Sequence, residues 1–167
     1  VYSPALTDFI MMSKENSYMF LTGPKVVKTV TGEDVTEDKL GGAIVHSTKS
    51  GVAHFVGDTE QDVLNMIRRL MSYIPSNNFE EAPYVPTNDP IDRLEDSLNT
   101  IIPESPNTPY DVKEIIHSIV DDGEFMEVHA KWATNLVVGF ARFNGMSVGI
   151  VANQPCSMAG VLDINSS

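Results

Sequence analysis

The segment 134–155, TNLVVGFARFNGMSVGIVANQP, constrains the fold of this chain more than any other. Two apolar runs, 136–141 and 148–151, flank an Asn144-Gly145 pair. Asn-Gly is the strongest short-range signal for a two-residue hairpin turn, because both residues tolerate positive φ. We therefore predict a β-hairpin. Nearly continuous apolar runs are typical of strands covered on both faces, so we expect the hairpin at the middle of a layered α/β domain.

The composition is that of a globular protein. Of the 167 residues, 42% are hydrophobic and 20% are charged, which separates the chain from disordered sequences. No apolar run approaches the roughly 20 residues of a membrane-spanning helix. The sequence opens in VYSPALTDF, without a leader peptide or an initiator Met, so we expect it to be part of a longer chain.

The charge and the cysteine content limit which binding partners and which cellular compartment fit this sequence. With 23 acidic and 11 basic residues, the net charge is −12, which argues against nucleic acid and anionic membranes as partners. Cys156 is the single cysteine, so no internal disulfide can form. A reducing compartment is the natural expectation, either a bacterial cytoplasm or a mitochondrial matrix.

Turn and cap residues divide the first half of the chain into short elements. The predicted elements are a helix that Ser3 caps and Pro4 begins, strands at 9–12 and 17–21, a helix from Pro24, a helix from Thr36 that ends at Gly41-Gly42, a mixed, turn-rich segment 43–55, and a helix that Asp58–Gln61 cap and Pro75 ends.

The segment 75–110 differs in character from the rest, because it holds seven of the ten prolines among Asn, Asp, Glu and Ser. Such a composition is typical of a linker. We therefore divide the chain into a first domain at 1–80, a linker at 81–110 and a second domain at 111–167. The second domain is predicted to hold a helix capped by Asp111, a turn at 121–123, a strand at 125–128, the hairpin, and a new helix from Ala159 to Ser167.

Side-chain motifs of catalysis or metal binding are missing from the sequence. The four histidines have neither the helical spacing nor the neighbouring ligands of a metal site, and no nucleophile elbow, Walker A loop or dinucleotide fingerprint occurs. His46 and His54 flank Ser50-Gly51, which leaves a local site there open, although ordinary packing roles fit as well. We expect no metal and no catalytic side chain.

Longer strings of residues carry a resemblance. YSPALTDF, SYMFLTGP, SGVAHF, IIHSIVDDGEFMEV and VGFARFNGMSVGIVANQP resemble the carboxyltransferase (β) subunit of biotin-dependent acyl-CoA carboxylases, most of all the propionyl-CoA carboxylase type. The resemblance runs over residues 1–167 in the family's order. It implies a ClpP/crotonase-like α/β fold of β-β-α superhelices. Residues 1–80 would be the C-terminal part of one such domain and 111–167 the first part of a second.

The resemblance also implies a reaction and its partners. A carboxyl group moves from carboxybiotin to the α-carbon of an acyl-CoA, as in propionyl-CoA to methylmalonyl-CoA, through an enolate held by backbone oxyanion holes. This chemistry requires no side-chain nucleophile and no metal from the subunit. The implied partners are a biotin carboxylase, a biotin carrier subunit and further copies of the carboxyltransferase subunit, in a hexamer.

The glycine-rich oxyanion segments of the family fall outside residues 1–167, so we expect no catalytic residue and no activity in this chain alone. The residues that the resemblance assigns to substrate binding are Tyr2, Ser3, Pro4 and Ala5 on the acyl-CoA side, and Asn153 and Gln154 on the biotin side. A structural helix start and a strand-ending turn are the ordinary alternatives for these two groups.

Two other functions remain open. The α subunit of methylmalonyl-CoA decarboxylase is a near relative in the family and would run the transfer toward biotin. A crotonase-like module without activity, serving interaction or assembly, is the alternative of a different class.

Overall fold

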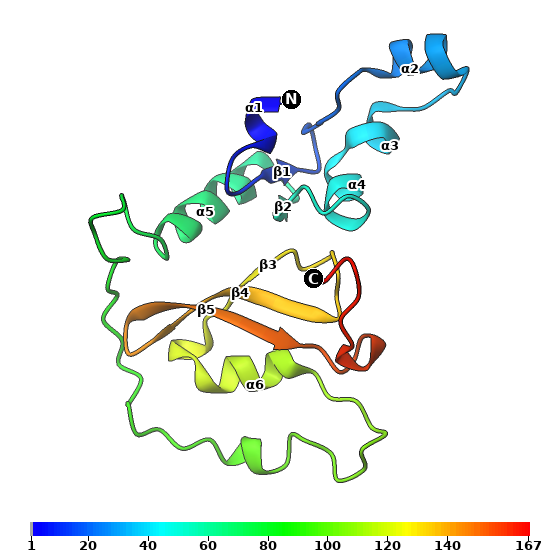
Figure 1. Cartoon of the computed structure of the whole chain (residues 1–167). Helices are drawn as coiled ribbons and strands as arrows, with labels where there is room; N and C mark the ends of the chain where they lie inside the picture. The colour runs from blue at the N-terminus through cyan, green and yellow to red at the C-terminus, as the bar shows by residue number, and fades with distance from the viewer. Residues whose placement is uncertain (1) are drawn as a thin grey trace. The chain divides into compact units, whose positions relative to one another are not determined.

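The computed structural model describes residues 2–167, and the chain divides into two compact units, 1–68 and 69–167 (Figure 1). This division falls before the Pro-rich segment, so residues 69–110 group with the second unit. The predicted domain borders, after residues 80 and 110, stay a prediction.

The first unit is built from short elements around a small parallel pair of strands. β1 (Met11–Ser13) pairs with β2 (Phe55–Gly57), with Met12 opposite Val56. The buried core beside them consists of Ile10, Met12, Ala43 and Ala53. The helices are α1 (Tyr2–Ala5), α2 (Pro24–Thr31), α3 (Glu37–Gly41), α4 (Ala43–Thr48) and α5 (Glu60–Met71), whose last residues belong to the second unit.

Several predicted caps are confirmed. Pro24 begins α2, and the helix ends at Gly32, whose φ of 78° lets its N–H reach the Lys28 carbonyl. Thr36 caps α3 by accepting from the Lys39 N–H at 3.3 Å. Before α5, Thr59 and Asp62 exchange backbone and side-chain bonds at about 3 Å, which is a capping box with Asp in place of Glu.

Two predictions for the first unit are wrong. Residues 17–21 form no named strand; Tyr18 makes only an isolated bridge with Gly42, because the Met19 N–H donates at 2.8 Å to the carbonyl of Gly41 at the end of α3. The segment 43–55 is not irregular but holds α4 and the start of β2. In α4 the hydroxyls of Ser47 and Thr48 donate to the Ile44 carbonyl of their own helix. These side chains therefore do not make the local turn bonds that usually compete with a helix.

The second unit carries the predicted hairpin. β4 (Leu136–Phe143) and β5 (Met146–Asn153) pair antiparallel, with Phe143 opposite Met146 and Leu136 opposite Asn153. Asn144 and Gly145 have φ of 50° and 78°, as the Asn-Gly turn requires. The further elements are η1 (Asp96–Asn99), α6 (Val112–Ile119), η2 (Asp121–Gly123), β3 (Met126–Val128), which pairs with β4, and η3 (Met158–Gly160).

One face of the β3-β4-β5 sheet packs on α6, which lies along it in Figure 1. Alternate residues of β4, Val137 and Ala141, are almost wholly buried there. They meet Ile116 and Val120 from α6 and its end, and Phe125 before β3. The predicted helix and the predicted strand at 125–128 are thereby confirmed, with Asp111 as the helix cap.

The expectation that both faces of the hairpin are buried is wrong. Burial alternates along β4, and on β5 the Val151 side chain is 72% exposed. An antiparallel sheet can leave one face in water, and α6 packs against the other. Part of the open face is covered by Tyr73, whose ring stacks on Phe140 at 5.8 Å and lies 4.0 Å below the Arg142 guanidinium.

The predicted helix 159–167 is also wrong. Met158, Ala159 and Gly160 have φ of 49°, 52° and 70°, and consecutive left-handed residues cannot continue a right-handed helix. The segment instead turns back to the start of β4. There the buried Asn135 amide donates to the Val161 carbonyl at 2.7 Å and to the Ser166 hydroxyl at 2.9 Å.

Candidate functional site

The predicted acyl-CoA side lies in α1, a single turn in which every residue is exposed. Ser3 and Pro4 accept from the N–H groups of Leu6 and Thr7 at 3.2 Å. Because α1 begins at Tyr2, Ser3 lies inside the helix instead of capping it, so the predicted cap is wrong. The role of Tyr2, Ser3, Pro4 and Ala5 toward acyl-CoA stays a prediction.

The predicted biotin side lies where β5 ends. The Asn153 amide donates to the Gly160 carbonyl at 2.5 Å and closes the loop 153–160. Gln154 is only 6% exposed. Its side-chain oxygen accepts from the N–H groups of Val112 and Cys156 at 3.3 and 3.4 Å.

The other end of the Gln154 amide meets α6. Its Nε2 donates at 2.7 Å to Oδ1 of Asp111, and the same oxygen accepts from the Lys113 N–H at 2.9 Å. Burial works to raise the pKa of Asp111, but the bonds from Gln154 and Lys113 outweigh it and bring the pKa below its ordinary 3.8. Gln154 therefore joins the loop after β5 to the start of α6.

The structure brings together Asn153, Gln154, Asp111 and the loop 153–160, and Tyr2–Ala5 belong to the other compact unit. The amides of Asn153 and Gln154 are used in bonds within the protein. These bonds hold the backbone of the loop in place, through the buried Gln154 and through one amide N–H of the exposed Asn153.

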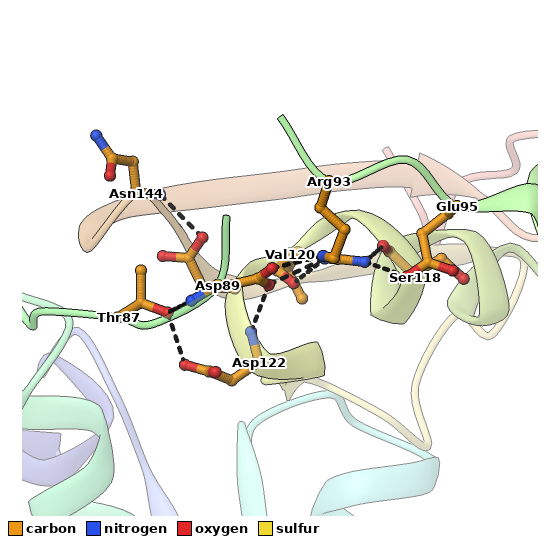
Figure 2. A network of polar contacts seen from close by, with 9 residues as sticks. Thr87, Asp89, Arg93, Glu95, Ser118, Val120, Asp122 and Asn144 are labelled. Carbon is orange, nitrogen blue, oxygen red and sulfur yellow. Dashed lines mark hydrogen bonds and ion pairs between the residues drawn. The ribbon is translucent and has the colours of Figure 1, made fainter. Parts of the chain in front are cut away.

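Sequence reasoning missed a second cluster, in the segment that we predicted as a linker (Figure 2). The Arg93 guanidinium forms a fork with Asp89, at 2.5 Å through Nε and 3.0 Å through Nη2, and an ion pair with Glu95. It also donates to the carbonyls of Ser118 and Val120 at 2.8 and 3.3 Å. These carbonyls lie at the C-terminal end of α6 and have no partner within the helix, although that of Val120 also accepts from the Gly123 N–H at 3.3 Å.

Further bonds extend this Arg93 cluster to the hairpin. Asp89 accepts from the Asp122 N–H at 3.1 Å, and the Thr87 hydroxyl donates to the Asp122 carboxylate at 3.0 Å. The neighbouring Asp121 carboxylate accepts from the two backbone N–H groups of the β4–β5 turn at 2.9 and 2.7 Å. The segment that we predicted as a linker is thus bound to the second unit. The only indication of this binding in the sequence is an Asp and an Arg four residues apart.

A cavity of about 360 Å³ lies beside this cluster, with Ile119, Phe143 and Met146 among its apolar walls. Its lining carboxylates are those of Asp89, Glu95 and Asp121. Each of them is already bonded to Arg93 or to backbone N–H groups. The polar groups of the cavity therefore serve the fold.

The Asp89 carboxylate should make stability depend on pH. The bond from Arg93, together with the Asp122 N–H, lowers the pKa of Asp89 below 3.8. A carboxyl group whose pKa is lower in the folded than in the unfolded state stabilises the folded state at pH values above its unfolded-state pKa. This stabilisation is lost as the pH falls from 3.8 through the folded-state pKa. Asp89→Asn should lower the urea midpoint at neutral pH, and its difference from wild type should shrink steadily on acidification.

Asp92→Asn is the matched control, because Asp92 is exposed in the same segment and makes no hydrogen bond or ion pair among residues 2–167. It should follow wild type at every pH. A difference between Asp89→Asn and wild type that stays constant down to the acid limit would contradict the assigned role of the carboxylate.

His46 and His54 have ordinary structural roles. His46 bonds to Ser50 at 2.8 Å and to the Met19 carbonyl at 2.5 Å, and His54 accepts from the Ile10 N–H at 3.0 Å. Within residues 2–167 no three His, Cys, Asp or Glu side chains gather as metal ligands. None of the helices described there has the length and apolar character needed to cross a bilayer.

The chain is a mixed α/β protein, and its structural similarity to a solved carboxyltransferase confirms the predicted fold of the crotonase type. The family model described as carboxyl transferase domain matches residues 1–167. The chain therefore belongs to the carboxyltransferase family, and the predicted resemblance is confirmed.

Individual relatives are similar over the whole chain. It is 56% identical to the methylmalonyl-CoA decarboxylase subunit alpha of Veillonella parvula and 52% identical to the propionyl-CoA carboxylase beta chain of Roseobacter denitrificans, covering 100% of this chain and 33% of each relative. A crystal structure of transcarboxylase 12S, a hexamer with methylmalonyl-CoA and methylmalonic acid bound, matches with a TM-score of 0.94 and 52% identity, over 99% of this chain and 32% of that one. The chain thus spans about one third of the length of these relatives.

Proposed function

We propose that this chain is the central part of a carboxyltransferase subunit that moves a carboxyl group between biotin and the α-carbon of an acyl-CoA, with propionyl-CoA and methylmalonyl-CoA as the acyl pair. The observation that carries the proposal is the match of all 167 residues to the carboxyl transferase domain. The TM-score of 0.94 with a transcarboxylase that has methylmalonyl-CoA bound supports the choice of substrate.

In this proposal the chain forms the scaffold of the carboxyltransferase site and the residues that border its two substrates. Biotin, when bound, carries the carboxyl group, and the backbone donors for the enolate come from segments outside residues 1–167. Tyr2–Ala5 border the acyl-CoA. Asn153 and Gln154 border the biotin, and since their amides are engaged internally, they act by holding the loop 153–160.

Two directions of reaction fit. Similarity to a propionyl-CoA carboxylase beta chain favours carboxylation of propionyl-CoA, coupled to a biotin carboxylase and a biotin carrier. Similarity to a methylmalonyl-CoA decarboxylase subunit favours transfer from methylmalonyl-CoA to biotin. In either case we propose that the subunit forms a homo-oligomer, as the transcarboxylase 12S hexamer does.

The same relatives also support a proposal for the cellular compartment. We propose a bacterial cytoplasm, or the mitochondrial matrix if the source is a eukaryote, because the propionyl-CoA carboxylase beta chain of Sus scrofa is described as mitochondrial and shares 52% identity with this chain. The single cysteine agrees with a reducing environment.

The first test is the mass and activity of the natural protein that contains this sequence. A mass about three times 18.3 kDa is expected from the coverage of the relatives. That protein should carboxylate propionyl-CoA when given ATP, bicarbonate, biotin carboxylase and biotin carrier, or should transfer the carboxyl group of methylmalonyl-CoA to free biotin. A protein of full size without either activity would leave the non-catalytic module as the better proposal.

Gln154 provides a sharper test of the biotin side. Gln154→Ala in the full-length protein removes two hydrogen bonds that hold the loop 153–160 to the start of α6, and a third within the loop. Misplacement by about 1 Å at a reacting centre can reduce the rate by roughly a hundredfold, so we expect KM for free biotin to rise at least roughly tenfold. KM for the acyl-CoA should hardly change. Unchanged biotin kinetics in both Gln154→Ala and Asn153→Ala would refute this placement.

A further inference from the structure

The two clusters described above hold opposite ends of one helix. At the C-terminal end of α6, Arg93 donates to the carbonyls of Ser118 and Val120. At the N-terminal end, Asp111 caps the helix and accepts from Gln154. We propose that Arg93 is a positioning residue for the loop 153–160 and acts on it through α6. This inference rests on the proposed function, because it makes Arg93 a determinant of biotin use.

Arginine suits this position for a physical reason. The last carbonyls of a helix lack intrahelical partners, and positive charge near them interacts favourably with the helix dipole. The planar guanidinium donates in several directions at once, so one side chain can satisfy both carbonyls and the Asp89 carboxylate. The side chains of Arg93 and Asp89 are 28% and 11% exposed, so water competes little for these bonds.

α6 is short and stiff enough to transmit a shift. Its eight residues span roughly 12 Å, and Ile116 in the middle is buried against the sheet. A packed helix of this length moves as one rigid element. If the C-terminal end loses Arg93, the helix can slide along its axis, and Asp111 then moves away from the Gln154 amide.

The same loss also loosens the hairpin. Asp89 holds the Asp122 N–H, and the adjacent Asp121 holds the turn between β4 and β5. β5 leads from that turn directly into Asn153 and Gln154. Both routes from Arg93, through α6 and through β5, therefore converge on the loop 153–160.

The test uses the full-length protein with free biotin as carboxyl acceptor and methylmalonyl-CoA as donor. Arg93→Ala should raise KM for biotin roughly tenfold and leave KM for methylmalonyl-CoA within about twofold. Arg93→Lys keeps the charge and one or two of the bonds, so its effect should lie between wild type and Arg93→Ala. Arg68→Ala is the matched control, because the Arg68 side chain is exposed and makes no hydrogen bond or ion pair among residues 2–167.

Hydrogen exchange provides a readout that does not depend on activity. The N–H groups of Val112 and Cys156, which donate to Gln154, should exchange faster in both Arg93 variants and at the wild-type rate in Arg68→Ala. Equal rises in both KM values, or exchange rates unchanged at these two amides, would overturn the inference. A wild-type protein without activity would instead refute the proposed function, and the exchange rates would still decide whether Arg93 acts on the loop.

Discussion

Gly139→Ala should destabilise the second unit by about 3 kcal/mol, because side-chain atoms forced into a packed core cannot be accommodated without backbone movement. A Cβ at position 139 would lie 2.6 Å from two ring atoms of Phe125 and closer still to the Met126 carbonyl oxygen. The carbonyl belongs to β3, which pairs with β4 at this point, so it cannot move without breaking the sheet. Urea unfolding followed by the fluorescence of Trp132, the single tryptophan, would measure the loss.

Gly149→Ala is the matched control for this substitution. Gly149 lies in β5 of the same sheet, and among the described residues no atom comes within 4 Å of a Cβ placed there. Neither glycine has a positive φ, so the two substitutions differ in packing alone. Gly149→Ala should change the unfolding free energy by less than about 0.5 kcal/mol. Similar losses in the two variants would show that the close approach of β3 to Gly139 is wrong.

Ile116→Ala should cost about 3 kcal/mol of unfolding free energy, since it removes buried methyl groups and leaves a cavity between α6 and the sheet. Ile116 is 3% exposed and contacts the same core as Val120 and Val137. The same urea titration would report the effect, because Trp132 and the core lie in one compact unit.

Ile119→Ala tests the same change of side chain on the same helix at a position that is 42% exposed. A side chain stabilises the fold in proportion to the apolar area that folding removes from water, and Ile119 keeps much of its area in water. This variant should therefore lose less than about 1 kcal/mol of unfolding free energy. If Ile119→Ala proved as harmful as Ile116→Ala, the face of α6 that packs on the sheet would have been assigned wrongly.

The expected results have a common basis in the second unit. Its sheet is covered by α6 on one face, and α6 is fastened at one end by Arg93 and at the other by Gln154. Core packing should therefore supply most of the stability, to which the Arg93–Asp89 pair adds a pH-dependent part, whereas the bonds of Arg93 and Gln154 should set the position of the loop 153–160.

Much of the local structure could be predicted from the sequence. The Asn144-Gly145 turn, the Thr36 and Asp111 caps and the Pro24 helix start depend on residues within a few positions of each other, and all are confirmed. The family could also be recognised, because strings over the whole chain carry it. The strings assign Asn153 and Gln154 to the biotin side, which stays a prediction, and they do not indicate the bonding partners of these side chains.

Where predictions were wrong, distant contacts outweighed local preference. Residues 17–21 have strand-forming side chains, but Met19 bonds to the end of α3. Residues 159–167 were predicted as a helix, but Asn135, far earlier in the chain, bonds to Val161 and Ser166 and holds the segment in a turn. Nothing within either segment indicates the distant group that binds it.

The chain's sequence alone determined the turn, the helix caps, the register-setting hairpin and the family, since each depends on neighbouring residues or on long strings in order. Tertiary structure alone decided which face of the hairpin is buried, that the Pro-rich segment is bound to α6, and that Gln154 meets Asp111. These outcomes depend on pairs such as Arg93 with Val120 and Gln154 with Asp111, which are 27 and 43 residues apart. Their hydrogen bonds form only once the sheet and α6 have packed together.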